Sequence, residues 1–126
     1  VGPLRGLAIN MVEMSDLVPT LAAVAAFAEG ATEIHGVGFI RNKESDRLGD
    51  LCRELRRTGV GAVDTGDGLI VTPAPMQMAT LETHNDHRLA MAFALVGLGA
   101  SGMVVDEPEV VSKSWPGFWS MIEGLR

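Results

Sequence analysis

The spacing of hydrophobic and polar positions predicts alternating strands and helices. In the clearest stretch, Leu48, Leu51, Cys52 and Leu55 recur at the i, i+3, i+4 and i+7 positions that share one face of a helix. Similar spacing predicts helices over residues 17–29, 46–58, 87–98 and 115–125. Short apolar runs bounded by turn residues predict strands over residues 7–14, 32–35, 61–63, 69–72, 79–84 and 103–106.

This order of elements contains an internal repeat. At an offset of 70 residues, Asp16 aligns with Asp86, Lys43 aligns with Lys113, and apolar positions coincide in the helices. A chance alignment of two apolar helices is the alternative, although it explains the lysine match poorly. We therefore expect a single α/β (α+β) domain fragment over residues 1–126. Residues 1–74 would form a βαβαββ unit and residues 75–126 a second, incomplete unit, whose missing strands would come from another segment.

Composition narrows the class of protein. The 126 residues are 47% hydrophobic and carry a formal net charge of −6, as expected for a compact globular domain. This acidic balance argues against nucleic acid or an anionic membrane as a partner. The longest uncharged run, residues 89–105, is short and broken by glycines, so a buried helix and strand are expected there rather than a membrane span. The single cysteine, Cys52, fits a core position in a protein of a reducing compartment.

One candidate anion site is the segment Asn85-Asp86-His87-Arg88. An arginine in the first turn of a helix opposes the helix dipole, which favours anions there, unless a bound anion shares the site. Two structural alternatives stay open at this stage. Asp86 is a good helix N-cap and would serve only in that role. Arg88 would pair with a carboxylate of the acidic surface.

A second group of charges precedes the helix predicted over residues 46–58. Lys43 and Arg47 are four residues apart, Glu44 lies between them, and Ser45 or Asp46 can cap the helix. The repeat places Lys113 in the corresponding loop. Cations gathered at helix N-termini in an acidic chain indicate a bound phosphate or carboxylate, and nearby Asp16 and Glu44 become candidates for proton transfer. The alternative is a solvated loop of salt bridges. Spacing gives no metal site.

Four motifs together resemble one family. They are Ser15-Asp16-Leu17-Val18-Pro19-Thr20, Lys43-Glu44-Ser45-Asp46-Arg47-Leu48, Asn85-Asp86-His87-Arg88-Leu89-Ala90-Met91-Ala92 and Ser112-Lys113-Ser114-Trp115-Pro116. In this order and at these spacings they are similar to the C-terminal portion of the 5-enolpyruvylshikimate-3-phosphate synthases. The related UDP-N-acetylglucosamine enolpyruvyl transferases lack this pair of central motifs and are the weaker match.

The resemblance implies a fold and a reaction. The family's fold has two domains, each of three βαβαββ units, and this chain would hold two units of one domain. The implied reaction moves the enolpyruvyl group of phosphoenolpyruvate to the 5-hydroxyl of shikimate 3-phosphate and releases phosphate, without metal or cofactor. It belongs to the cytoplasmic shikimate pathway that leads to chorismate and the aromatic amino acids. Without the missing N-terminal part, the chain alone would be inactive. A non-catalytic anion-binding domain is the alternative from another class.

The resemblance also implies residue roles. Asp16 would bind the shikimate hydroxyls and act as the base, Lys43 would contact the shikimate moiety, and Glu44 would donate a proton to the enol methylene. The implied phosphoenolpyruvate contacts are Arg47, Arg88, Lys113 and His87. One position departs from the pattern: many members carry an asparagine four residues before the lysine, where this chain has Phe39. Arg41 or Asn42 would be expected to replace that contact.

Overall fold

The computed structural model describes residues 4–112 and 114–125, and its order of elements is the predicted one. The first half contains β1 (Ala8–Asn10), α1 (Val18–Ala25), β2 (Thr32–His35), α2 (Arg47–Arg57), β3 (Gly61–Asp64) and β4 (Leu69–Thr72). The second contains β5 (Ala79–Glu82), α3 (His87–Gly99), β6 (Met103–Asp106) and α4 (Phe118–Gly124). Three short 3-10 helices connect them: η1 (Val12–Leu17), η2 (Gly38–Asn42) and η3 (Pro108–Val111). The α/β class is therefore confirmed.

The strands form two separate sheets. The first has the order β1-β2-β4-β3, in which β1 and β2 are parallel and β4 is antiparallel to both of its neighbours. The second pairs β5 with β6 in parallel, with Ala79 opposite Met103. Each half of the chain thus contains a parallel pair of strands joined across a helix.

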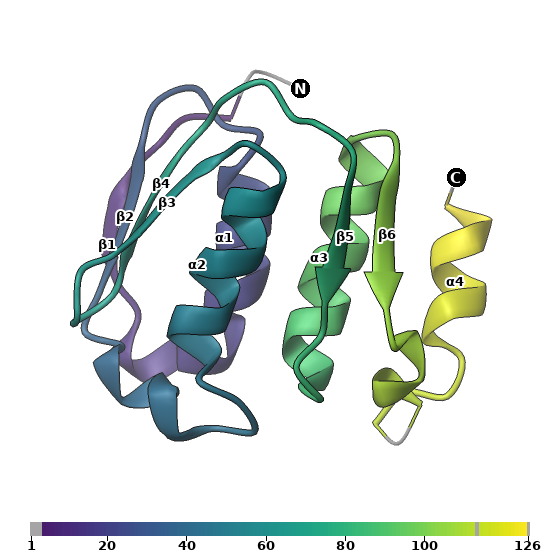
Figure 1. The fold of residues 1–126 in the computed structure, drawn as a ribbon. Coiled ribbons are helices and arrows are strands. Elements are labelled where there is room, and N and C mark those ends of the chain that lie inside the picture. The colour runs from purple at the N-terminus through teal and green to yellow at the C-terminus, as the bar shows by residue number, and fades with distance from the viewer. Residues whose placement is uncertain (1–3, 113, 126) are drawn as a thin grey trace.

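Helices fill the space between the sheets. In Figure 1, α1 and α2 lie against the four-stranded sheet, and α3 lies between them and the strands β5 and β6. The predicted stripe of α2 is confirmed, since Leu48, Leu51, Cys52 and Leu55 are fully buried. Burial also raises the pKa of the Cys52 thiol to about 11. Helix α3 is buried on two sides, because Leu89 and Phe93 join the main core while Ala90 and Ala94 pack with α4.

The N-termini of three helices lie at one end of the molecule. Figure 1 shows the starts of α1, α2 and α3 together at its lower edge, where the strands β5 and β6 also point. The helix predicted over residues 17–29 starts at Val18, with Pro19 in its first turn, but it already ends at Ala25. After that residue the chain tightens, since the backbone N–H groups of Phe27 and Ala28 donate to carbonyls three residues back. The strand predicted over residues 7–14 is also too long, because only Ala8–Asn10 form β1 and residues 12–17 form η1. The sequence-predicted site residues that the structure describes fall at this end.

We expect Gly68→Ala to destabilise the protein by about 2 kcal/mol or more, because overpacking against rigid backbone is costly. A Cβ at Gly68 would overlap the backbone carbonyl oxygen of Ile34 on β2, where Ile34 pairs with Leu69. Gly124→Ala is the matched control, since a Cβ there meets open space in α4. Measured by thermal unfolding, the free energy of unfolding of the control should lie within about 0.5 kcal/mol of that of the parent. Equal stability of the two variants would contradict this close approach of β2 and the turn before β4.

Candidate active site

A buried ion pair between Arg47 and Asp86 forms the centre of the candidate site. Arg47 is the first residue of α2 and is 1% exposed, and Asp86 is the N-cap of α3 and is 0% exposed. Arg47 Nε donates to Asp86 Oδ2 at 2.9 Å, and Nη2 donates to Oδ1 at 3.1 Å. A fork of this kind fixes the plane of the guanidinium as well as its position.

Asp86 accepts two further hydrogen bonds. Its Oδ1 accepts from the backbone N–H of Arg88 at 2.9 Å, which caps α3, and its Oδ2 accepts from the Ser45 hydroxyl at 2.9 Å. Burial by itself raises the pKa of Asp86, but the hydrogen bond and charge of Arg47, with these two donors, outweigh burial and hold that pKa below its usual value. Asp86 therefore stays ionised.

The turn that precedes Asp86 has an unusual backbone conformation. His84 and Asn85 both have left-handed φ angles, 52° and 57°. Such angles are uncommon outside glycine, and His and Asn are among the side chains that tolerate them best. His84 is also held from the side, since its Nε2 lies 2.8 Å from Oε2 of the fully buried Glu54 on α2. The turn between β5 and α3 is thus fixed by α2 at two places.

Two half-exposed carboxylates complete the ring around Arg47. Arg47 Nη1 donates to Asp16 Oδ1 at 3.2 Å, and Nη2 also donates to Glu44. The Asp16 and Glu44 side chains are 57% and 50% exposed, whereas that of Asp86 is fully buried. Asp86 thus holds the inner side of the guanidinium, and the other two carboxylates cover its outer side. Burial alone lowers the pKa of Arg47, but the surrounding carboxylates, led by Asp86, outweigh it and raise that pKa.

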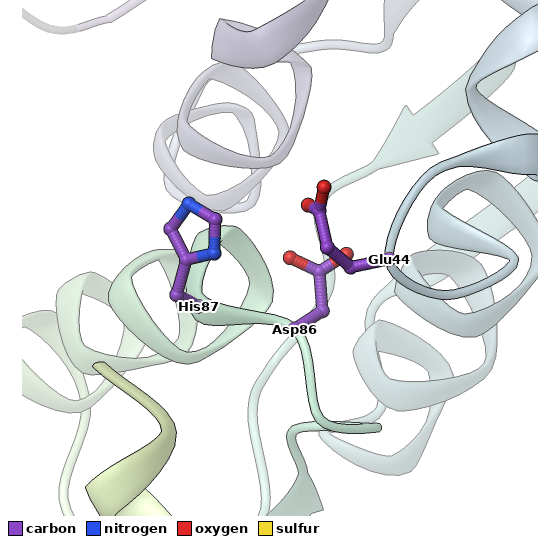
Figure 2. A group of neighbouring side chains, drawn as sticks. All are labelled: Glu44, Asp86 and His87. Carbon is purple, nitrogen blue, oxygen red and sulfur yellow. The ribbon is translucent and has the colours of Figure 1, made fainter. Parts of the chain in front are cut away.

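Arg88 and His87 lie beside this ring. Arg88 Nη2 is 3.9 Å from Asp16 Oδ2, a loose pair with the Arg88 side chain 38% exposed. Figure 2 shows Glu44 reaching from the loop before α2 towards Asp86 and His87 at the start of α3. The structure therefore brings Asp16, Glu44, Arg47, His87 and Arg88 together.

The two predicted lysines are a different case. Lys43 follows η2, and its Nζ lies 5.5 Å from the centroid of the Phe39 ring. Lys113 lies outside the described residues. Arg41, one proposed replacement for the family contact at position 39, instead pairs with Asp64 at 2.5 Å and with Asp46 at 3.7 Å.

Two groups of histidine and acid side chains bring possible metal-ligand atoms within 4.8 Å of one another in the described chain. They are Glu44, Asp86 and His87, and Glu54, Glu82 and His84. In each group an arginine pairs with a carboxylate, Arg47 in the first and Arg57 in the second. The geometry of both groups is that of an ion-pair network, and the predicted absence of a metal site stays a prediction.

Comparison with known proteins decides the family. The family model described as EPSP synthase (3-phosphoshikimate 1-carboxyvinyltransferase) matches residues 1–122. This chain belongs to the EPSP synthase family. A 3-phosphoshikimate 1-carboxyvinyltransferase of Methanoculleus marisnigri is 48% identical over 98% of the chain, and that of Syntrophobacter fumaroxidans is 43% identical over 99%. The chain spans 29% and 30% of these two relatives, respectively.

Solved structures agree with the EPSP synthase assignment. An EPSP synthase structure from Acinetobacter baumannii superposes with a TM-score of 0.85 at 30% identity, over 98% of this chain and 30% of that one. A second structure of an Acinetobacter baumannii EPSP synthase gives a TM-score of 0.81 at 28% identity. Within the part of the chain described here, no helix is long and apolar enough to cross a membrane.

Sequence reasoning missed part of this candidate site. Asp16 does not cap α1, whose N-cap is Leu17, and its carboxylate faces Arg47 and Arg88. Asp86 does cap its helix, as expected, but it also binds Arg47, which neither motif reveals alone. The match of Asp86 to Asp16 in the repeat and its place in the segment Asn85-Asp86-His87-Arg88 were the signals that pointed to it.

Asp86→Asn should destabilise the protein by about 3 kcal/mol, because it removes the only buried carboxylate among the three described around Arg47 and leaves that buried charge with the two half-exposed ones. Asparagine still caps helices, so the loss of stability would measure the ion pair with Arg47 rather than the capping of α3. Asp46→Asn is the matched control: Asp46 caps α2 through Gly49 but is exposed, and its loss of charge should cost within about 0.5 kcal/mol. Chemical denaturation at neutral pH compares the two variants.

The pH dependence gives a second readout of the same change. Since the pKa of Asp86 is lowered in the folded state, its contribution is present above the unfolded value of about 4 and is lost as pH falls through the lower folded value. The difference in stability between the parent and Asp86→Asn should therefore shrink below about pH 4. A pH-independent difference would contradict an ionised Asp86.

Proposed function

We propose that this chain is the C-terminal portion of a 3-phosphoshikimate 1-carboxyvinyltransferase. The enzyme would transfer the enolpyruvyl group of phosphoenolpyruvate to the 5-hydroxyl of shikimate 3-phosphate and release phosphate. The observation that carries the proposal is the ring of Asp16, Glu44 and Asp86 around Arg47, built from the motifs of the EPSP synthases. The names of the similar relatives support the same activity.

The two half-exposed carboxylates suit the proton transfers of this reaction. Addition of the 5-hydroxyl to the enol carbon requires that the hydroxyl lose a proton and that the methylene carbon gain one. We assign the first step to Asp16 as base and the second to Glu44 as acid, which forms a tetrahedral ketal. Loss of phosphate and of a methyl proton from that ketal then restores the enol in the product. Both carboxylates face the same guanidinium, so both would act where the two substrates meet.

Arg47 and Arg88 would hold the carboxylate of phosphoenolpyruvate, with His87 beside it. In the structure, Arg47 already contacts carboxylates through Nε, Nη1 and Nη2. These contacts use four of the five guanidinium N–H groups, so an incoming carboxylate that binds through both oxygens would have to replace one of them. The bidentate contact with buried Asp86 persists, whereas Glu44 and Asp16 stand on the exposed side. We propose that the substrate carboxylate takes the place of Glu44 on Arg47, which frees Glu44 to face the methylene carbon.

The remaining roles complete the proposal. Lys43 would contact the shikimate moiety, and Lys113 the phosphate of phosphoenolpyruvate. Residues 1–74 and 75–126 would be two units of one domain, and the rest of the enzyme would supply the other side of the cleft. The enzyme would act in the cytoplasm without a metal or cofactor.

Arg88→Ala in the full-length enzyme should raise the KM for phosphoenolpyruvate by about 10- to 150-fold, the value of one charge-assisted contact to a carboxylate. The fold should lose little, because a first-turn arginine is unfavourable to its own helix and Arg88 makes only a loose pair with Asp16. Steady-state kinetics and thermal unfolding measure the two effects. An unfolded variant, or an unchanged KM, would assign Arg88 a structural role.

Glu44→Gln should separate binding from chemistry. We expect kcat to fall by about 10²- to 10⁴-fold through loss of a proton donor. The Kd for phosphoenolpyruvate should decrease by about two- to fivefold, because a competing charge has been removed from Arg47. Glu33→Gln, an exposed acid on β2, is the control and should change neither quantity. Weaker binding of phosphoenolpyruvate by Glu44→Gln would rule out the exchange on Arg47.

A further inference from the structure

Lys43 differs from the other cations of the site in its surroundings. Arg47 and Arg88 pair with carboxylates, and so does Arg41 just before Lys43. Among the described residues, Lys43 makes no ion pair with a carboxylate, although Glu44 is its neighbour in sequence. Its ammonium instead lies over the face of the Phe39 ring, 5.5 Å from the centroid, within the range of a cation–π contact.

The Phe39 ring is held by its neighbours in η2 rather than by its own burial. Phe39 is 44% exposed, but Ile40 beside it is fully buried in the core. Arg41 pairs with Asp64, and the backbone N–H of Val37 donates to the Asp67 carbonyl at 2.7 Å, which ties η2 to the turn between β3 and β4. The ring therefore projects from a fixed one-turn helix towards the lysine at its C-terminal end.

We propose that Phe39 is a positioning residue for Lys43. The aromatic face gives the ammonium a preferred place without neutralising its charge, whereas a carboxylate partner would have to be displaced by an incoming anion. The three carboxylates of the ring, Asp16, Glu44 and Asp86, are already paired with arginines, so they compete weakly for Lys43. Lys43 is thereby kept available for an anionic, hydroxylated substrate. This inference rests on the proposed function, in which that substrate is shikimate 3-phosphate.

The test is a double-mutant cycle in the full-length enzyme, read out as the Kd for shikimate 3-phosphate by calorimetry. Phe39→Leu removes the ring and keeps an apolar side chain, and we expect it to raise this Kd by about two- to fivefold. Phe39→Trp retains an aromatic face and should stay within about twofold of the parent. In a Lys43→Met background, Phe39→Leu should have no further effect, because the ring then has no cation to place. The melting temperatures of the two Phe39 variants should be close to that of the parent, since Phe39 is half-exposed.

Three results would overturn the inference. They are an unchanged Kd in Phe39→Leu, an equal increase in the Lys43→Met background, and failure of Phe39→Trp to retain binding. The second would mean that the ring contacts substrate directly. If Lys43→Met itself leaves the Kd unchanged, the proposed role of Lys43 fails.

A second readout does not depend on substrate. In enzyme whose lysines carry ¹³C-methyl groups, the Lys43 signal, assigned with Lys43→Arg, should be shifted upfield by the ring. The signal should lose that shift in Phe39→Leu. An identical Lys43 signal in both proteins would refute the contact whatever the enzyme binds.

Discussion

The fork between Arg47 and Asp86 is the interaction on which the site depends. It joins the first residue of α2 to the N-cap of α3, and thus the first half of the chain to the second. Because both partners are buried, neither is stable without the other, and the two helix starts are held in one relative position. The exposed carboxylates of Asp16 and Glu44 are arranged around a guanidinium that cannot turn.

A second buried carboxylate links the two halves in the opposite direction. Glu54 belongs to α2, and it accepts from the backbone N–H of Glu82 at 3.0 Å and contacts His84 at 2.8 Å. In the Arg47–Asp86 pair, the carboxylate comes from the second half of the chain. In the contacts of Glu54, the carboxylate comes from the first half. Together they fix both ends of the segment that runs from β5 into α3, so that the position of Arg88 is set by contacts well away from its own side chain.

Local structure was largely predictable from the sequence, and long-range pairing was not. The stripe of Leu48, Leu51 and Leu55 identified α2 and its buried face, because helical periodicity is a local property. The end of α1 was misplaced, since the apolar residues continue to Ala28 while the helix itself stops at Ala25 and the chain tightens into turns. The family and its motif residues were also recognisable. The grouping of three carboxylates around one arginine was not, because Arg47 meets Asp16 and Asp86 across 31 and 39 residues of chain.

The left-handed turn at His84 and Asn85 has a consequence for how this sequence can vary. Position 84 must accept a positive φ and also present a polar group to a carboxylate that is fully buried. Few side chains meet both demands: glycine meets only the first, and lysine or glutamine meets only the second easily. A change at His84 would leave Glu54 without one of its partners. Positions 54 and 84 are therefore expected to co-vary: a replacement at one position should be accompanied by a replacement at the other.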